Sequence, residues 1–380
     1  MQSSGKQPEG GWGWMVVFGT FLVHVMAIGS YRSLGVFYVE FREVFHESAG
    51  NTSFISSVFI ATILMCSPIA SALSNLTSCR TVVMAGGVIS AVGLGVSYFA
   101  QSVVHLIITI GLISGLGLSL MYAPNLAMIG RYFDRRHATA SGIAVSGLGV
   151  GNFALPPLFQ FLIDEFGWRG ALLIVAGLML NGCVCGALMR PIHLAEDQTI
   201  DRKAQSSGDQ ELPMVHHRPF LVFSVSMFAM QLGNSVVSVH LVAHAQNLGV
   251  EKTSAAFLLS IMGVSEIFSR PLNGWLSDRG KISKVYYYMI GVTGMAIANL
   301  AIPFASSYTG LVVCMVLYGL FSGIVFPLIA VLVCSYSGAS RISSGLGWNF
   351  VFQGAAFLLG PPVAGKQFYQ LESFVEKIVT

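Results

Sequence analysis

Charged residues are scarce in this sequence. Only 10% of its 380 residues are Asp, Glu, Lys or Arg, whereas 54% are hydrophobic and the mean hydropathy is +0.71. A soluble domain carries roughly 25% charged residues. A chain of this length with so few charges lacks the polar side chains to cover a surface in water. A soluble fold is therefore excluded, and lipid is the expected surrounding.

The sequence also lacks the residue patterns of metal sites, disulfide frameworks and enzymes. Its six cysteines form no CxxC pair, and no histidine cluster accompanies them. Free cysteine in an apolar run normally packs as a small apolar side chain. No nucleophile–base set and no phosphate-binding loop stands out. We therefore expect neither an enzyme nor a bound cofactor.

No separable signal peptide is predicted at the start of the chain. The first apolar run extends from Trp12 to Phe41. It is longer than the apolar region of a signal peptide, roughly 7–15 residues, and has no clear cleavage site. It is predicted to be a first transmembrane helix.

Apolar runs of about 20 residues, the length that spans a bilayer, recur along the chain. They predict eleven helices and an all-α membrane protein. The predicted ranges are 12–39, 53–75, 81–100, 104–130, 138–163, 168–189, 219–246, 253–277, 285–305, 308–336 and 342–365.

The one long polar interruption predicts the domain organisation. Residues 190–218 are rich in charge, Ser, Gly and Gln and read as a flexible linker. They separate a six-helix half (1–189) from a second half of about five helices (219–380), as in transporters built from two repeats. The tail after Pro362 is too short and too polar for a twelfth span. We therefore expect a truncated or alternatively spliced second half.

The basic residues predict the orientation in the membrane. With the N-terminus in the cytoplasm, thirteen of the twenty Lys and Arg residues fall on the cytoplasmic side, five fall outside and two lie within spans. Because basic residues favour cytoplasmic loops, the N-terminus and the linker are predicted to be cytoplasmic.

Three charged residues lie within predicted spans, namely Arg32, Glu266 and Arg270. A charge at a helix centre costs about 2.5–3.5 kcal/mol on insertion scales, so each predicts a functional or pairing role. Glu266 and Arg270 are four residues apart, on one helix face, and can pair. Arg32 then remains as an unneutralised cation that the carboxylate of a substrate would balance, and protonation of Glu266 would alter this balance. The alternative is that Arg270 pairs only as structural glue and that both arginines extend towards the membrane surfaces.

The segment 274–281, GWLSDRGK, places Asp278 and Arg279 at the end of a predicted helix between glycines. From its chemistry, it is either a latch that favours one gate conformation or an ordinary charged turn. It resembles the cytoplasmic signature GxLxDRxG of the major facilitator superfamily. Its counterpart at 74–80, SNLTSCR, lacks the aspartate. This departure argues against a matching latch in the first half.

Two further segments resemble the monocarboxylate transporter family, solute carrier family 16. Residues 9–14, EGGWGW, contain Trp12 and Trp14 and are similar to the sequence that opens the first helix in that family. Residues 132–144, YFDRRHATASGIA, contain Arg135 and are similar to the family signature that leads into the fifth helix. The GWRG segment at 167–170 also fits. The similarity covers nearly the whole chain except for the absent last helix.

The resemblance implies a major facilitator fold and a plasma-membrane carrier of small monocarboxylates that works by alternating access. It places Arg32 where family members carry a basic residue, often Lys, that meets the substrate carboxylate. Glu266 and Arg270 stand where the family has an Asp and an Arg that hold substrate and proton. Arg136 and Ser141 occupy positions tied to substrate recognition or gating. The expected partners are a small carboxylate solute, protons, the lipid bilayer and a single-span accessory glycoprotein.

Two departures from the family keep the substrate open. Arg replaces Lys at position 32, and an arginine cannot release its proton, so Glu266 would carry any proton alone. The family also includes carriers of aromatic amino acids, thyroid hormones and creatine, some without proton coupling. One alternative is therefore pH-independent transport of a zwitterion such as creatine or an amino acid. A second alternative is a truncated, non-transporting product that binds a full-length carrier or a single-span accessory glycoprotein and regulates its trafficking.

Overall fold

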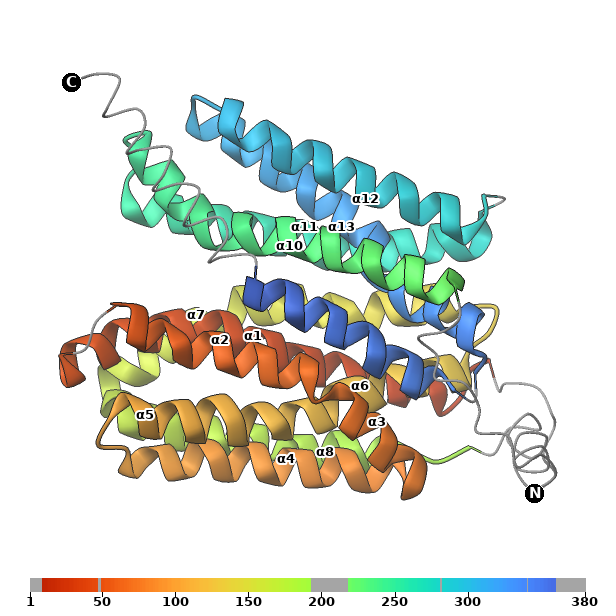
Figure 1. Cartoon of the computed structure of the whole chain (residues 1–380), viewed down its shortest axis with the longest axis horizontal. Helices are drawn as coiled ribbons and strands as arrows, with labels where there is room; N and C mark the ends of the chain where they lie inside the picture. Colours follow the sequence, from red (N-terminus) through yellow and green to blue (C-terminus); the bar gives the residue numbers. More distant parts are fainter. Residues whose placement is uncertain (1–8, 47–48, 193–217, 281, 340, 360–380) are drawn as a thin grey trace.

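The computed structural model describes residues 9–46, 49–192, 218–280, 282–339 and 341–359, and within these ranges it contains helices and no strands. The helices run roughly parallel to one long axis (Figure 1). This arrangement confirms the predicted all-α membrane class. The predicted linker and the tail after 359 fall almost entirely outside the described residues.

A first group of helices comes from the N-terminal part of the chain. The long helices α1 and α7 are the central members of this group. Its ranges are α1 (Gly13–Phe45), α2 (Ala49–Met65), α3 (Ser67–Leu76), α4 (Cys79–Val96), α5 (Val103–Leu106), a π-helix (Ile107–Ser114), α6 (Gly115–Tyr132), α7 (His137–Met179) and α8 (Asn181–Leu188).

A second group follows the predicted linker. It consists of α10 (Arg218–Asn247), α11 (Lys252–Arg279), α12 (Lys284–Ala301), α13 (Tyr308–Ser337) and a helix over residues 342–359. We call the last of these the 342–359 helix. The division of the chain into two halves at the linker remains a prediction.

Seven helical runs among the described residues are long and apolar enough to span a membrane, against eleven predicted spans. One run, His137–Leu188, contains two of the predicted helices, 138–163 and 168–189. Gly167 interrupts it with a φ of +66°, a backbone conformation that favours glycine. The other three predicted spans correspond to α10, α11 and the 342–359 helix, which are helical but fall outside this apolar set. α11 carries the buried charges Glu266 and Arg270.

Large apolar side chains cover much of the outer surface. Phe304 is 85% exposed, Phe99 75% and Phe268 71%. A water-soluble monomer rarely exposes extensive apolar patches, whereas lipid-facing helices do. The outer surface thus supports the membrane assignment independently of hydropathy.

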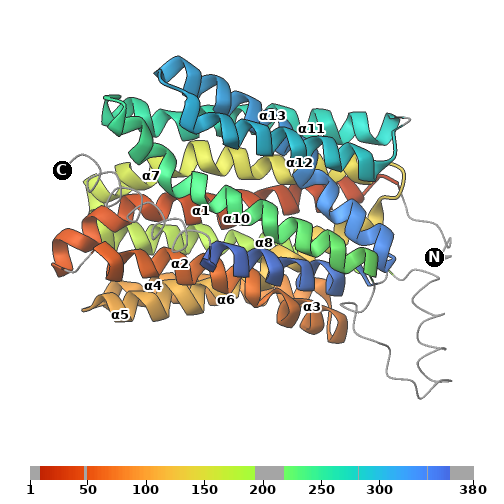
Figure 2. The ribbon, with the colours of Figure 1, turned by 45° about the horizontal axis from the view of Figure 1, so that its top comes forward.

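The two groups of helices meet along α7, which packs against both α1 and α11. Figure 2 shows α7 and α1 between α11–α13 on one side and α4–α6 on the other. The contact is close because glycines line it. A Cβ on Gly274 of α11 would collide with the backbone carbonyl of Ala138 on α7. The 342–359 helix crosses to the first group, where Phe350 lies 5.2 Å from the ring of Tyr122 on α6. The site described next lies between these elements.

Candidate solute-binding site

A cavity lies between the two groups of helices. The centres of water-sized molecules can occupy a volume of about 70 Å³ in it. By the same measure, a single water needs only about 10–15 Å³. The cavity therefore has room for several waters or a small solute. The first group contributes side chains that include Tyr31, Ile60, Tyr122 and Asn152, and the second contributes Gln231, Glu266, Arg270, Tyr318, Phe326 and Gln353.

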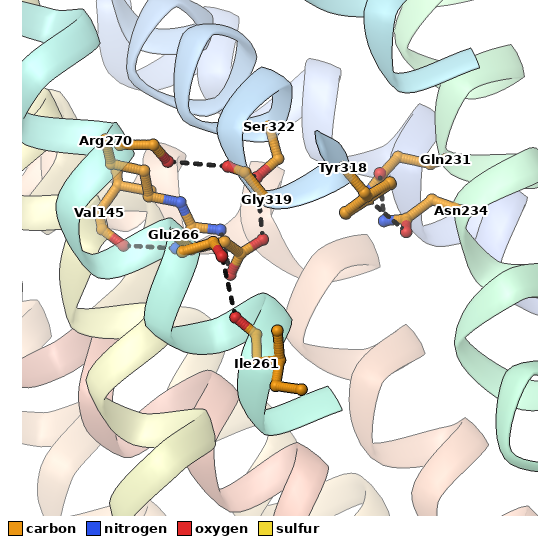
Figure 3. A network of polar contacts seen from close by, with 11 residues as sticks. Val145, Gln231, Asn234, Ile261, Glu266, Arg270, Tyr318, Gly319 and Ser322 are labelled. Carbon is orange, nitrogen blue, oxygen red and sulfur yellow. Dashed lines mark hydrogen bonds and ion pairs between the residues drawn. The ribbon is translucent and has the colours of Figure 1, made fainter. Parts of the chain in front are cut away.

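The charged part of the cavity wall is an ion pair on α11. Arg270 Nη2 lies 2.9 Å from Glu266 Oε2, and the residues are only 2% and 3% exposed. Their spacing of four residues puts both on one helix face. Ser322 on α13 donates a hydrogen bond of 3.0 Å to Glu266 Oε1 (Figure 3). The predicted pair is thus present and faces the interior of the bundle.

Arg270 also connects the two groups of helices. Its Nη1 donates a 2.9 Å hydrogen bond to the carbonyl of Val145 on α7 (Figure 3). On its other side, the guanidinium carbon lies 5.0 Å from the ring centre of Phe326 on α13, a cation–π geometry. Removing one partner of a buried pair leaves an uncompensated charge, which costs about 3–5 kcal/mol. Loss of either residue would therefore leave a buried charge without its counter-charge.

A proline follows a cavity residue directly on each of two helices. Pro271 follows Arg270 on α11, and Pro327 follows Phe326 on α13. Proline has no backbone N–H, so each helix loses one internal hydrogen bond at this level. Both helices thus have a turn beside the cavity with one backbone hydrogen bond fewer.

The cavity also has a neutral polar wall that the sequence analysis did not identify. Tyr318 donates a 2.6 Å hydrogen bond to Asn234 Oδ1, and Asn234 donates to Gln231 Oε1 at 3.2 Å. Gln231 in turn lies 3.5 Å from Gln353 of the 342–359 helix. The sequence did contain a signal for this wall, namely the amide side chains inside apolar runs. An amide in a spanning helix needs a hydrogen-bond partner, so each such residue predicts a polar contact. Counting only charged residues missed them.

The remaining predicted binding residues lie elsewhere or have undescribed side chains. Arg32 belongs to α1, but its side chain lies outside the described set. Arg136 is exposed at the start of α7. Ser141 is buried on α7, and its Oγ has no hydrogen-bond partner among the described residues. Neither Arg136 nor Ser141 borders the cavity, so their roles in recognition or gating remain predictions.

Asp278 makes a contact between the two groups of helices. Its carboxylate accepts hydrogen bonds from the backbone N–H groups of Ala138 (3.1 Å) and Thr139 (2.7 Å) and from the Thr139 hydroxyl (2.6 Å). These N–H groups belong to the first turn of α7, which has no internal acceptors for them. Arg279 is exposed and stacks on Trp275 at 4.3 Å. Of the two signature residues Asp278 and Arg279, Asp278 is thus the one whose described contacts join the two groups of helices.

The N-terminal motif folds onto the other family signature. Glu9 Oε1 accepts hydrogen bonds from the backbone N–H groups of Asp134 (2.8 Å) and Arg135 (2.6 Å). Trp14 packs against Phe133 with ring centres 5.1 Å apart. Trp12 donates to the carbonyl of Leu188 at 2.8 Å.

The end of α8 completes this arrangement. The guanidinium of Arg190 lies 3.5 Å from the ring centre of Trp12, a cation–π contact. The motif therefore clamps the α6–α7 turn and the end of α8 to the start of α1. Through these contacts, Trp12, Trp14 and the backbone of Arg135 hold helices of the first group together.

Comparison with known proteins identifies the superfamily and the fold. The model of the Major Facilitator Superfamily matches residues 20–361. The solved structure of the human organic anion transporter MFSD10 (TETRAN) superposes with a TM-score of 0.73 over 93% of each chain. At 15% sequence identity, this likeness shows the fold alone.

Curated relatives identify the family more narrowly. The chain is 41% identical to monocarboxylate transporter 13 of Rattus norvegicus over 95% of this chain and 83% of that protein. It is 38% identical to human monocarboxylate transporter 12, over 96% and 76% of the two chains. It is also 36% identical to monocarboxylate transporter 4 of Rattus norvegicus, over 95% and 78%. The chain is therefore a multi-pass membrane transporter that belongs to the monocarboxylate transporter family of the major facilitator superfamily.

Proposed function

We propose that this transporter carries small monocarboxylates of the lactate and pyruvate type by alternating access. The observation that carries the proposal is the buried Glu266–Arg270 pair in a cavity between the two groups of helices. A guanidinium matches a carboxylate with two parallel hydrogen bonds, and a water-poor setting strengthens them. Arg32 is the second proposed carboxylate-binding residue.

The pair offers a physical route to proton coupling. While Glu266 is ionised, it holds Arg270 at 2.9 Å and neutralises it. A proton on Glu266 removes that counter-charge, and Arg270 then favours a carboxylate from the solute. When a solute anion and a proton enter together, their charges cancel, so the net charge of the cavity stays the same as in the empty state. Ser322 is placed to bond Glu266 in either state, since its hydroxyl can donate or accept.

The substrate assignment is tested by uptake of labelled lactate and pyruvate in cells with confirmed surface expression. Arg270→Gln is expected to lower uptake at least tenfold, since it removes the charge that receives the carboxylate. Arg42→Gln is the matched control, because Arg42 is an exposed arginine in the last turn of α1 that belongs to none of the motifs and does not border the cavity. An absence of flux for every monocarboxylate in the wild-type protein would overturn the proposal.

Proton coupling has its own test. Glu266→Gln keeps the shape of the side chain but cannot change charge. Net uptake in this variant is expected to lose its dependence on an inward proton gradient, while exchange of solute across the membrane continues. An unchanged pH profile would remove Glu266 from the coupling step.

A second candidate is pH-independent transport of a zwitterion such as creatine or an amino acid. The cavity wall favours it in one respect, because it presents an anionic and a cationic group together, Glu266 and Arg270. Uptake of labelled creatine and amino acids at two external pH values separates the candidates. Zwitterion flux that ignores the proton gradient and is abolished by Arg32→Ala would establish this alternative.

We further propose that the carrier works in the plasma membrane with its N-terminus in the cytoplasm. The distribution of basic residues supports this orientation. Accessibility of an N-terminal epitope tag before and after permeabilisation tests it. Repeating the surface measurement with and without a co-expressed single-span glycoprotein tests the proposed accessory partner.

A further inference from the structure

A row of buried polar side chains, most of which border the cavity, lies apart from the ion pair. It runs from Tyr318 through Asn234 and Gln231 to Gln353, and continues to Asn349, which accepts from Gln353 at 2.7 Å. All five residues are less than 9% exposed. Figure 3 shows Tyr318, Asn234 and Gln231 gathered apart from Glu266 and Arg270. The row links α13, α10 and the 342–359 helix.

The row is a directed chain of donors and acceptors, and its bonds to other described residues do not use every donor. Each amide carries two N–H bonds. Asn234, Gln231 and Gln353 each donate once along the row. All three border the cavity, and each retains a second N–H. The cavity therefore has, apart from its charged wall, a neutral wall with surplus donors.

Spacing along α13 relates the two walls. Tyr318 bonds the amide row, and Ser322, four residues later, bonds Glu266. Four residues advance a helix by about 6 Å and return to the same face. A solute that touches both walls must therefore be short, with a polar oxygen only a few bonds from its carboxylate.

We infer that the amide row of Asn234, Gln231 and Gln353 determines solute specificity by binding a hydroxyl or oxo oxygen of a short carboxylic acid. This inference deepens the proposed function and rests on it. A site built to hydrogen-bond a polar group rejects the analogue that lacks the group, because the buried donors are then left unpaired. The carrier thus prefers hydroxy- and oxo-substituted acids over unsubstituted acids of the same length.

The test compares two three-carbon acids that differ in one hydroxyl, lactate and propionate. The wild-type protein is expected to take up lactate with the higher kcat/KM. Asn234→Leu replaces the amide by an apolar group of similar size. It is expected to lower the lactate-to-propionate ratio of kcat/KM about tenfold, mainly by raising KM for lactate. Gln353→Met tests the same wall from a different helix and is expected to act in the same direction.

The control is Asn273→Leu. Asn273 lies on α11 close to Arg270, but its amide bonds the carbonyl of Ser269 and it does not border the cavity. This variant is expected to leave the ratio unchanged. If Asn234→Leu and Gln353→Met reach the surface and lower both acids equally, or leave the ratio unchanged, the inference is overturned. If the wild-type protein transports neither acid, the proposed function itself fails.

Discussion

At the end of the bundle where α1, α4, α7 and α12 begin, the hydrogen bonds between described residues of the two groups include two contacts of different chemistry. In the carboxylate contact, Asp278 at the end of α11 accepts three hydrogen bonds from Ala138 and Thr139 at the start of α7. In the hydroxyl contact, the end of α3 meets the start of the 342–359 helix. Ser71 donates to the Ser343 carbonyl at 2.7 Å, Ser74 lies 3.0 Å from the Ser343 hydroxyl, and Asn75 donates to Ser344 at 3.2 Å.

Both contacts join a helix end of one group to a helix start of the other, but only one of them uses a charge. A carboxylate at a helix N-terminus is stabilised by the helix dipole, and hydrogen bonds to charged groups are roughly twice as strong as neutral ones. If the bundle opens at this end during transport, both contacts must separate. The two contacts therefore stabilise the closed end unequally, and Asp278 contributes the larger share of the free energy.

The largest effect is expected from Asp278→Ala. It leaves two N–H groups of α7 without acceptors and removes a favourable charge, which amounts to about 2 kcal/mol. The open population at this end should rise about 30-fold. Double electron–electron resonance between spin labels at Arg80 and Tyr286, both exposed beside the two contacts, measures it in a background without native cysteines.

The matched control for this variant is Asp278→Asn. It keeps the size and one acceptor oxygen but removes the charge, so the shift should be intermediate. A distance distribution in the alanine variant that equals the wild-type distribution would show that the carboxylate contact does not hold this end closed.

A smaller shift is expected from Thr139→Val. The change removes one of the three bonds to Asp278, the 2.6 Å hydroxyl contact, and leaves both backbone bonds in place. The loss of about 1 kcal/mol corresponds to roughly a fivefold rise in the open population. Thr139→Ser retains the hydroxyl and should behave like the wild type in the same resonance measurement. A shift as large as that of Asp278→Ala would instead indicate collapse of the turn.

The sequence predicted the fold well because the signals were long. Apolar runs of about 20 residues set the helix positions, and the observed α13, Tyr308–Ser337, differs from the predicted 308–336 by a single residue. Gly167 marks the break between two helices that otherwise form one apolar run. Local signals of this kind require no knowledge of which helices become neighbours.

The site was predicted only in part, since most of it depends on contacts between distant helices. Glu266 and Arg270 could be paired because they are four residues apart on one helix. The bond from Tyr318 to Asn234 joins residues 84 positions apart, and nothing local connects them. The missing aspartate at 74–80 argued against a copy of the Asp278 contact there, and that expectation remains a prediction. It gave no sign of the serines that bond the 342–359 helix in its place.

The hydroxyl contact should be weakened only slightly by Ser74→Ala. The variant removes the 3.0 Å contact with the Ser343 hydroxyl but leaves the Ser71 bond to the Ser343 carbonyl. A neutral hydrogen bond contributes about 0.5–1.5 kcal/mol net, so the open population should rise about threefold. The same pair of labels reports it. If Ser74→Ala raised the open population as much as Asp278→Ala does, the two contacts would not differ in how strongly they stabilise the closed end.

The smallest effect is expected from Asn75→Asp, which turns the hydroxyl contact into a partial copy of the carboxylate contact. The side chains are isosteric, but the Nδ2 donor to Ser344 becomes an acceptor, so the Ser344 hydroxyl must donate instead and a charge is added near the first turn of the 342–359 helix. Asn75 is exposed, and a surface carboxylate at a helix N-terminus contributes about 0.5 kcal/mol, so the open population should fall about twofold. Because the new interaction is electrostatic and exposed, 1 M salt should erase it, while the wild-type distribution should change little. A shift towards the open state, or one that persists in 1 M salt, would show that charge is not what distinguishes the two contacts.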